Sequence, residues 1–145
     1  MKYFLISLAL LCAVASQSSP EPSKPVESAL AVVHIYRANQ FTAKLRSPAV
    51  YCNEAPLAKM QNGRYFTIKL LPGRYAFRSE DKGVGIQINA EAGKEYFVRV
   101  EMALGSFKGT QQVAEVSKEQ GESELRVLKP IDRDRVIDKE RVLLE

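Results

Sequence analysis

Histidine and cysteine are scarce in this sequence. Its 145 residues include one histidine, His34, and two cysteines, Cys12 and Cys52. One histidine cannot build a zinc site without other protein ligands, and no Cys-x-x-Cys spacing is present. Cys12 lies in the apolar N-terminal run, where it is either removed or acylated, so Cys52 has no intramolecular partner. We therefore expect no metal, no cofactor and no disulfide framework.

A long hydrophobic run is missing after residue 15. Residues 3–14 are apolar apart from Ser7 and follow Lys2, but the run stops at polar residues 16–19. A bilayer-spanning helix needs about 20 apolar residues, so a transmembrane helix is the weaker interpretation. Ala13-Val14-Ala15 offers the small residues that signal peptidase recognises. Residues 1–15 are predicted to be a signal peptide, which makes the protein periplasmic or secreted.

The alternative is an exported protein that is anchored to the envelope by a lipid on Cys12. Cys12 follows Leu11, whereas a lipobox has a small residue before its acylated cysteine. Residues 16–28 combine serine with three prolines, a composition typical of a flexible linker. If Cys12 were acylated, this linker would be the tether to the envelope. Because Leu11 is bulky, the sequence favours an exported protein that is not anchored by a lipid.

The charge balance is only mildly basic. The chain has a formal net charge of +4, which is too small to indicate nucleic-acid binding. Residues 30–116 hold 12 Lys and Arg against 7 Asp and Glu. A basic surface on this part would suit anionic lipid headgroups or acidic envelope polymers, and a solvated surface of mixed charge is the alternative.

Short apolar stretches separated by turn residues indicate a β-rich domain over residues 29–116. Residues 30–36 are apolar on both alternating faces, as in a central strand. Asn62-Gly63, Pro72-Gly73 and Ala92-Gly93-Lys94 are hairpin-type turns, and Pro72-Gly73 is expected to return the next strand antiparallel to the one before it. The regular spacing predicts an antiparallel sandwich or small barrel.

Residues 117–145 have a different pattern, which predicts a helical segment. Ser117 and Gln120 form a capping-box start, and Pro130 is expected to end the helix. From Ile131 onward, dense charges among apolar residues favour a second amphipathic helix over a frayed terminus. The expected fold class is mainly β, a small antiparallel β-sandwich with one or two C-terminal helices.

No catalytic constellation emerges from the chemistry-bearing residues. His34 lies inside a predicted strand, where a structural role is the usual one. Cys52 is best interpreted as a packed free thiol. A Cys52/His34 nucleophile pair is conceivable, but no third orienting group or oxyanion hole is marked. We therefore expect a protein that is not an enzyme.

Several motifs, taken in their order along the chain, resemble one known family. They are His34-Ile-Tyr-Arg37, Val50-Tyr51, Asn62-Gly63-Arg-Tyr65, Leu71-Pro-Gly-Arg-Tyr75 and Ala92-Gly-Lys-Glu-Tyr-Phe97. This pattern is similar to the family named domain of unknown function 2846, and its turn motifs also occur in PEGA-type modules. The resemblance implies a bacterial envelope protein, often a lipoprotein, with a small immunoglobulin-like or transthyretin-like β-sandwich and no established role. It supplies no catalytic residues.

The function expected by elimination is a binding or interaction module of the cell envelope. Its partner would be an envelope protein, a glycan or a lipid headgroup, with no role for nucleic acid. Exposed tyrosine and arginine are favoured contact residues, so the predicted partner-binding face consists of Tyr36, Arg37, Tyr51, Arg64, Tyr65 and Arg74. The alternative is a carrier of a small hydrophobic ligand, held between the sheet and the C-terminal helix in a cavity lined by Phe66, Phe77, Ile86 and Val98.

Overall fold

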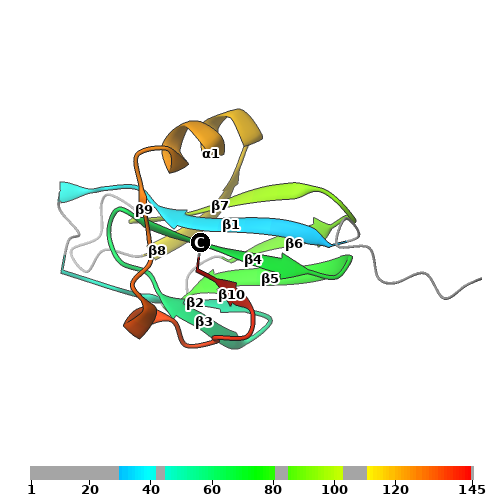
Figure 1. Cartoon of the computed structure of the whole chain (residues 1–145), viewed down its shortest axis with the longest axis horizontal. Coiled ribbons are helices and arrows are strands. Elements are labelled where there is room, and N and C mark those ends of the chain that lie inside the picture. The colour runs from blue at the N-terminus through cyan, green and yellow to red at the C-terminus, as the bar shows by residue number, and fades with distance from the viewer. Residues whose placement is uncertain (1–29, 42–44, 81–84, 103–110, 145) are drawn as a thin grey trace, which may run out of the picture.

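Two β-sheets make up most of the described chain (Figure 1). The structure is a computed structural model that describes residues 30–41, 45–80, 85–102 and 111–144. The expected signal peptide and linker lie outside the described residues. No helix in the described ranges has the length and apolar character needed to cross a membrane.

Sheet A has six strands and sheet B has four. Across sheet A the order is β10 (Val142–Leu143), β4 (Arg64–Leu70), β1 (Ala31–Arg37), β7 (Glu95–Met102) and β8 (Gln111–Val116), with β9 (Lys129–Pro130) also paired to β4. Across sheet B the order is β3 (Ala55–Lys59), β2 (Ala49–Cys52), β5 (Gly73–Ser79) and β6 (Ile86–Ala90). The sheets pack face to face, which confirms the small β-sandwich.

The predicted central strand is confirmed as β1. It lies between β4, to which it is antiparallel, and β7, to which it is parallel, so the sandwich is not wholly antiparallel. Val33 and Ile35 point into the core, while His34 and Tyr36 alternate onto the outer face of sheet A. This alternation places His34 on the side of the sheet that α1 covers.

The three glycine turns do not make hairpins within one sheet. Asn62-Gly63 leads from β3 to β4, Pro72-Gly73 from β4 to β5, and Ala92-Gly93-Lys94 from β6 to β7, so each turn crosses between the sheets. The expectation that β5 pairs with β4 is therefore wrong. Local turn chemistry reverses the chain, whereas the sheet that a strand joins depends on distant partners. The β2–β3 hairpin turns instead at Asn53 and Glu54, both with positive φ.

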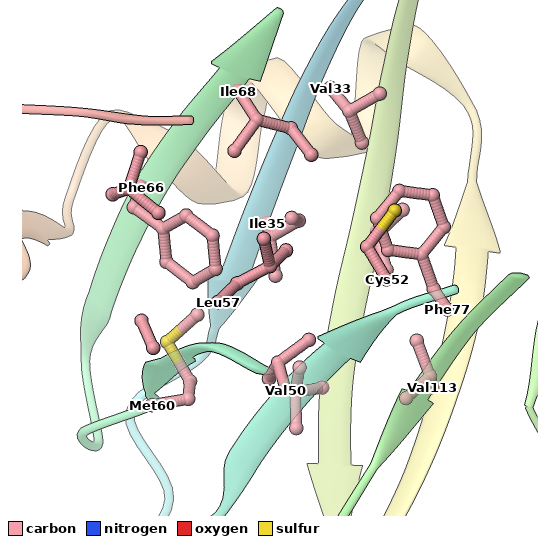
Figure 2. Close-up of a cluster of buried hydrophobic side chains, with 14 of the residues drawn as sticks. Val33, Ile35, Val50, Cys52, Leu57, Met60, Phe66, Ile68, Phe77 and Val113 are labelled. Atoms are coloured by element: carbon pink, nitrogen blue, oxygen red, sulfur yellow. The ribbon is translucent and has the colours of Figure 1, made fainter. Parts of the chain in front are cut away.

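The core lies between the inner faces of the two sheets (Figure 2). Sheet A contributes side chains such as Ile35 and Val98, and sheet B contributes others such as Val50 and Cys52. Three of the four side chains expected to line a carrier cavity, Phe66, Phe77 and Val98, are buried here, and Ile86 packs against them. They fill the space between the sheets, so a cavity between sheet and helix is not lined by these residues.

The predicted helix forms as α1 (Lys118–Leu125) and lies over the outer face of sheet A (Figure 1). The Ser117 side chain accepts a hydrogen bond from the Gln120 amide at 3.3 Å, which confirms the N-cap. The helix ends at Leu125 with Arg126 as its C-cap, earlier than the expected stop at Pro130, which belongs to β9.

The second C-terminal helix is not formed. Residues 131–144, here called the C-terminal strap, contain a 3₁₀ turn (Arg133–Arg135) and β10, and they run along one side of the sandwich. Their buried side chains, Ile131, Val136 and Val142, would not share one helical face, because Val136 would lie about 140° around the axis from Ile131. Val136 bridges to Ala58 at the edge of sheet B, and β10 pairs with β4 at the edge of sheet A. The strap therefore joins one edge of each sheet.

Candidate functional site

A groove of about 530 Å³ lies between α1 and the outer face of sheet A. Its floor consists of His34 from β1, Tyr65 and Thr67 from β4, and Glu95 and Phe97 from β7. Its wall consists of Glu122, Leu125 and Arg126, from α1 and its C-cap. Four separate segments therefore build one concave surface, the type of site at which ligands bind.

His34 occupies the middle of the groove floor because of strand register. In the sheet, His34 lies opposite Thr67 on β4 and opposite Phe97 on β7. Its Nδ1 is 2.9 Å from the Thr67 hydroxyl oxygen, and its ring centroid is 5.0 Å from that of Phe97. These contacts hold the imidazole in one orientation on the floor.

Gly121 lets the helix approach the sheet closely. A Cβ atom at this position would lie 2.3 Å from two ring carbons of Phe97, a distance that real Cβ atoms essentially never show. Gly121 is also the buried residue of α1. The helix backbone therefore rests directly on the Phe97 ring, and this contact sets the depth of the groove.

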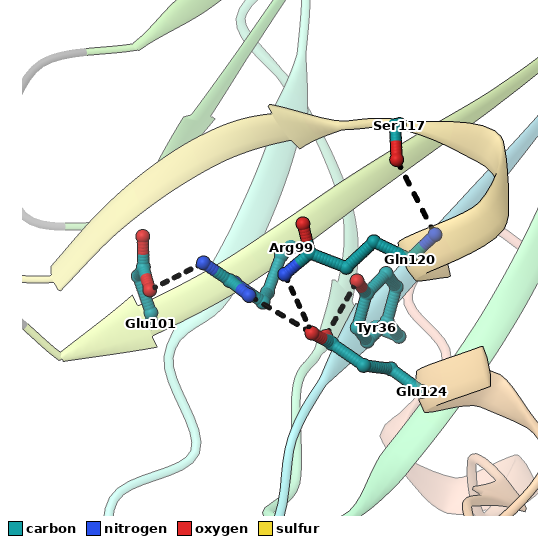
Figure 3. A network of polar contacts seen from close by, with 6 residues as sticks. All are labelled: Tyr36, Arg99, Glu101, Ser117, Gln120 and Glu124. Atoms are coloured by element: carbon teal, nitrogen blue, oxygen red, sulfur yellow. Dashed lines mark hydrogen bonds and ion pairs between the residues drawn. The ribbon is translucent and has the colours of Figure 1, made fainter. Parts of the chain in front are cut away.

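A polar cluster beside this contact ties α1 to the sheet (Figure 3). The buried Tyr36 hydroxyl donates to Glu124 Oε2 at 2.7 Å, and Arg99 Nη1 donates to Glu124 Oε1 at 3.0 Å. Gln120 Nε2 donates to the same Oε1 at 2.8 Å, and Arg99 also pairs with Glu101 at 3.1 Å. Each Glu124 oxygen is thus satisfied by a donor from the sheet, and the carboxylate anchors the helix.

The contacts in this cluster shift the pKa values of Tyr36 and Glu124. Burial, reinforced by the hydrogen bond to Glu124, raises the pKa of Tyr36 well above its usual value, so the phenol stays neutral. Burial alone would raise the pKa of Glu124, but the hydrogen bonds from Tyr36 and Gln120 and the Arg99 charge lower it below 4.5. Glu124 is therefore a carboxylate that the fold holds in its charged form.

Glu124→Gln should lower the free energy of unfolding by about 1–3 kcal/mol at neutral pH, because it removes the negative charge and replaces one of the two accepting oxygens by an NH2 donor. A lowered folded pKa means that Glu124 contributes stability above pH 4.5 and loses that contribution as the pH falls through the folded pKa. The variant should thus show a shallower loss of stability below pH 4.5. Urea denaturation followed by circular dichroism at several pH values measures both effects.

The matched control for this prediction is Glu119→Gln, an exposed position in the first turn of the same helix. It should change stability by less than about 0.5 kcal/mol. If the free energy of unfolding falls equally with pH below pH 4.5 in the two variants, Glu124 does not anchor α1.

The rim of the groove carries charges of both signs. Lys118 Nζ lies 2.8 Å from Glu95 Oε2 and 3.6 Å from Glu122 Oε1, so this one cation contacts both groove acids. The hydrogen bond from Lys118 lowers the pKa of Glu95. Arg126 is exposed and makes no ion pair or side-chain hydrogen bond with the other described residues. The two acids and two cations of the rim balance in number, and the cation without an ion pair, Arg126, lies at the C-terminal end of α1.

A second pocket, of about 560 Å³, lies at the end of α1. The connection after the helix contributes Val127, which is 83% exposed, the turn before β4 contributes Gly63, and β4 contributes Arg64. Arg64 Nη1 donates to the Pro130 carbonyl at 3.0 Å and forms an ion pair of 3.5 Å with Asp132. Arg64 therefore serves mainly to hold the chain after α1 against β4.

Two members of the predicted partner-binding face are buried, so their assignment as surface contacts is wrong. Tyr36 is 0% exposed because α1 covers the outer face of sheet A at this point. Arg37 is 1% exposed and donates from Nη1 to the carbonyl oxygens of Arg46 at 2.5 Å and Met60 at 3.4 Å. Sequence alternation cannot show that a distant helix will cover one face of a strand.

The other four predicted residues lie on different sheets. Arg64 and Tyr65 belong to β4 in sheet A, and Tyr65 lines the groove. Tyr51 and Arg74 belong to β2 and β5 in sheet B. The six residues therefore do not form one continuous face.

Sequence reasoning considered His34 and Tyr65 but missed the other residues of the groove, namely Thr67, Glu95, Phe97, Glu122, Leu125 and Arg126. One signal was available, since a glycine inside a predicted helix often marks close packing against another element. Gly121 is such a residue. It would have pointed to the sheet-facing side of the helix, although it could not have identified the strands beneath.

The conceivable Cys52/His34 pair is not brought together. Cys52 is buried in the core from sheet B, and burial raises the pKa of its thiol. His34 lies on the outer face of sheet A, with the core residues of β1 facing the other way. Among the residues with described positions, no group of three or more His, Cys, Asp or Glu could hold a metal ion.

Comparison with known proteins identifies the family. The family model described as Protein of unknown function (DUF2846) matches residues 27–112. This stretch contains β1 to β7 and thus the whole groove floor, whereas α1 and the C-terminal strap follow it. No curated protein and no solved structure matches the chain. Since the match covers more than half of the chain, the resemblance in the sequence is confirmed, and the chain belongs to the DUF2846 family of proteins of unknown function.

Proposed function

We propose that this protein is an exported, non-catalytic binding module of the bacterial cell envelope, and that it holds a segment of a partner protein in the groove beside α1. The observation that carries the proposal is the groove itself, which four segments of the chain build together. Export is proposed from the signal-peptide pattern of residues 1–15.

The chemistry of the groove favours a polypeptide over an apolar ligand. Tyr65 and Leu125 offer half-buried apolar surface, and the rim has charges of both signs. Protein interfaces typically combine such aromatic and apolar contacts with complementary charged pairs. A hydrophobic-ligand carrier would instead need an enclosed apolar cavity, and the side chains expected to line it fill the core between the sheets.

Arg126 is the residue on which the partner would depend most. It has no partner of its own among the described residues and stands at the end of the groove wall. An acidic side chain of the partner would form a new ion pair there without breaking one inside the domain. We therefore expect the recognised segment to carry at least one Asp or Glu beside an apolar residue.

The test is capture of detergent-solubilised envelope proteins on the immobilised chain, with Arg126→Glu and Arg74→Glu compared. Both substitutions reverse the charge of an exposed arginine, but only Arg126 lies in the groove. A partner should be retained by the wild type and by Arg74→Glu, and its affinity for Arg126→Glu should fall at least tenfold. His34 is the one histidine of the sequence, so its ring resonance in NMR should shift when the purified partner is added.

Two results would contradict this function. One is a partner that binds both charge-reversed variants equally and leaves the His34 resonance unmoved. The other is the absence of any captured partner at physiological salt. Either would show that the groove is not the binding site of this domain.

A further inference from the structure

The outer face of sheet B has an unusual charge composition. The four strands of this sheet contain Lys59, Arg74 and Arg78 and no aspartate or glutamate. The strands of sheet A, by contrast, contain the acids Glu95, Glu101 and Glu115 among their cations. One side of the sandwich is therefore uniformly basic along its strands, and the other is mixed.

The cations of sheet B lie on its outward side. Phe77 and Ser79 point inward from β5, so Arg74, Ala76 and Arg78 alternate outward from the same strand. Tyr51 of β2 lies opposite Arg78, and the Arg78 guanidinium carbon is 4.1 Å from the centre of the Tyr51 ring. We define the basic face as Tyr51, Lys59, Arg74 and Arg78.

Most of this positive charge is not neutralised inside the domain. Arg78 pairs with Glu54 in the β2–β3 turn at 2.9 Å. Lys59 and Arg74 are exposed and make no side-chain hydrogen bond or ion pair with another residue that the structure describes. Their neighbours across the strands, Ala49 and Asn89, carry no charge, although the Glu80 carboxylate accepts a hydrogen bond from the Ala49 amide at 3.2 Å. The basic face is therefore open to an anionic partner.

We propose that the basic face docks on the anionic phospholipid headgroups of a membrane surface. A sheet face presents its cations on one broad surface, here with Lys59 near one end and Arg74 near the other, which suits a plane of headgroups. Tyrosine beside arginine is also a favourable pair at a membrane interface. Because α1 lies over sheet A, on the opposite side of the sandwich, this docking would leave the groove facing away from the lipid (Figure 1). The inference does not depend on the proposed function of the groove.

The experiment is co-sedimentation of the chain from Ser16 onward, which lacks the apolar residues 3–14 and Cys12, with vesicles of phosphatidylglycerol mixed with phosphatidylcholine, and with vesicles of phosphatidylcholine alone. The double variant Lys59→Glu/Arg74→Glu is compared with Arg133→Glu/Lys139→Glu, which makes the same change in net charge at exposed positions of the C-terminal strap. Circular dichroism of each variant checks that the fold is retained.

We expect the parent chain and the Arg133→Glu/Lys139→Glu variant to bind the anionic vesicles, and we expect added salt to weaken this binding. The Lys59→Glu/Arg74→Glu variant should lose at least tenfold in affinity. Equal losses in the two double variants would mean that only net charge matters and would overturn the proposal. Failure of the parent chain to prefer anionic vesicles would overturn it too, as would binding to a soluble acidic polysaccharide in place of vesicles.

Discussion

Gly121→Ala is expected to lower the free energy of unfolding by about 2 kcal/mol. Alanine normally improves a helix by about 1 kcal/mol relative to glycine, so helix propensity alone predicts the opposite sign. Here the new methyl group would lie 2.3 Å from the Phe97 ring, and overpacking of this kind typically costs about 1–3 kcal/mol. The chain has no tryptophan, so urea unfolding is best followed by circular dichroism.

Two further variants separate the Phe97 contact from a general effect on the helix. Ser123→Ala changes an exposed position of the same helix and should be neutral or slightly stabilising. Phe97→Ala removes Cγ and Cδ1, the two ring atoms nearest to the new methyl group, so Gly121→Ala should cost less in that background, as a double-mutant cycle measures. If Gly121→Ala is as well tolerated as Ser123→Ala, the helix does not rest on Phe97.

Removal of residues 131–145 is expected to abolish cooperative folding of the monomer. The strap buries Ile131, Val136 and Val142, which are 4%, 7% and 5% exposed. Each such side chain contributes about 1.5–3 kcal/mol on burial, and the sum is comparable with the total stability of a small domain. The truncation would also expose the edges of β4 and β3, which favours aggregation. Size-exclusion chromatography and thermal unfolding measure both effects.

Point variants keep this prediction testable if the truncated chain does not fold. Val142→Ala should lower the free energy of unfolding by about 1–3 kcal/mol, because it leaves a cavity beside β4. Ile137→Ala is the matched control, since this neighbouring side chain is 45% exposed and should cost less than about 1 kcal/mol. Equal losses for the two variants would show that the strap is not part of the core.

The amino-acid pattern predicted the strands better than their arrangement. The inward set Phe66, Ile68 and Leu70 is buried as the alternation of β4 required, and the central position of β1 followed from its apolar residues on both faces. Asn62-Gly63 and Pro72-Gly73 were correctly recognised as turns. The expected pairing of β5 with β4 was wrong, because a turn that reverses the chain can also lead the next strand into the opposite sheet.

The candidate site was harder to predict because its parts are far apart in sequence. Tyr36 and Glu124 are 88 residues apart, yet they share a hydrogen bond, and Arg99 joins them from a third element. Tyr36 was predicted as an exposed contact since its own strand gives no sign of α1. The start of the helix at Ser117 was predictable, because an N-cap is a local hydrogen bond, but the surface that the helix covers was not.

The sequence by itself determined the β-rich class, the family, the alternation of core and surface along each strand and the N-terminus of the helix. These features depend on residues within a few positions of one another, whose spacing and turn chemistry act locally. Only the tertiary structure decided which sheet each strand joins, that the last residues form a strap, and that His34, Phe97 and Arg126 meet in one groove. Those outcomes arise from pairing and packing between distant segments, for which a linear pattern specifies the faces but not the partners.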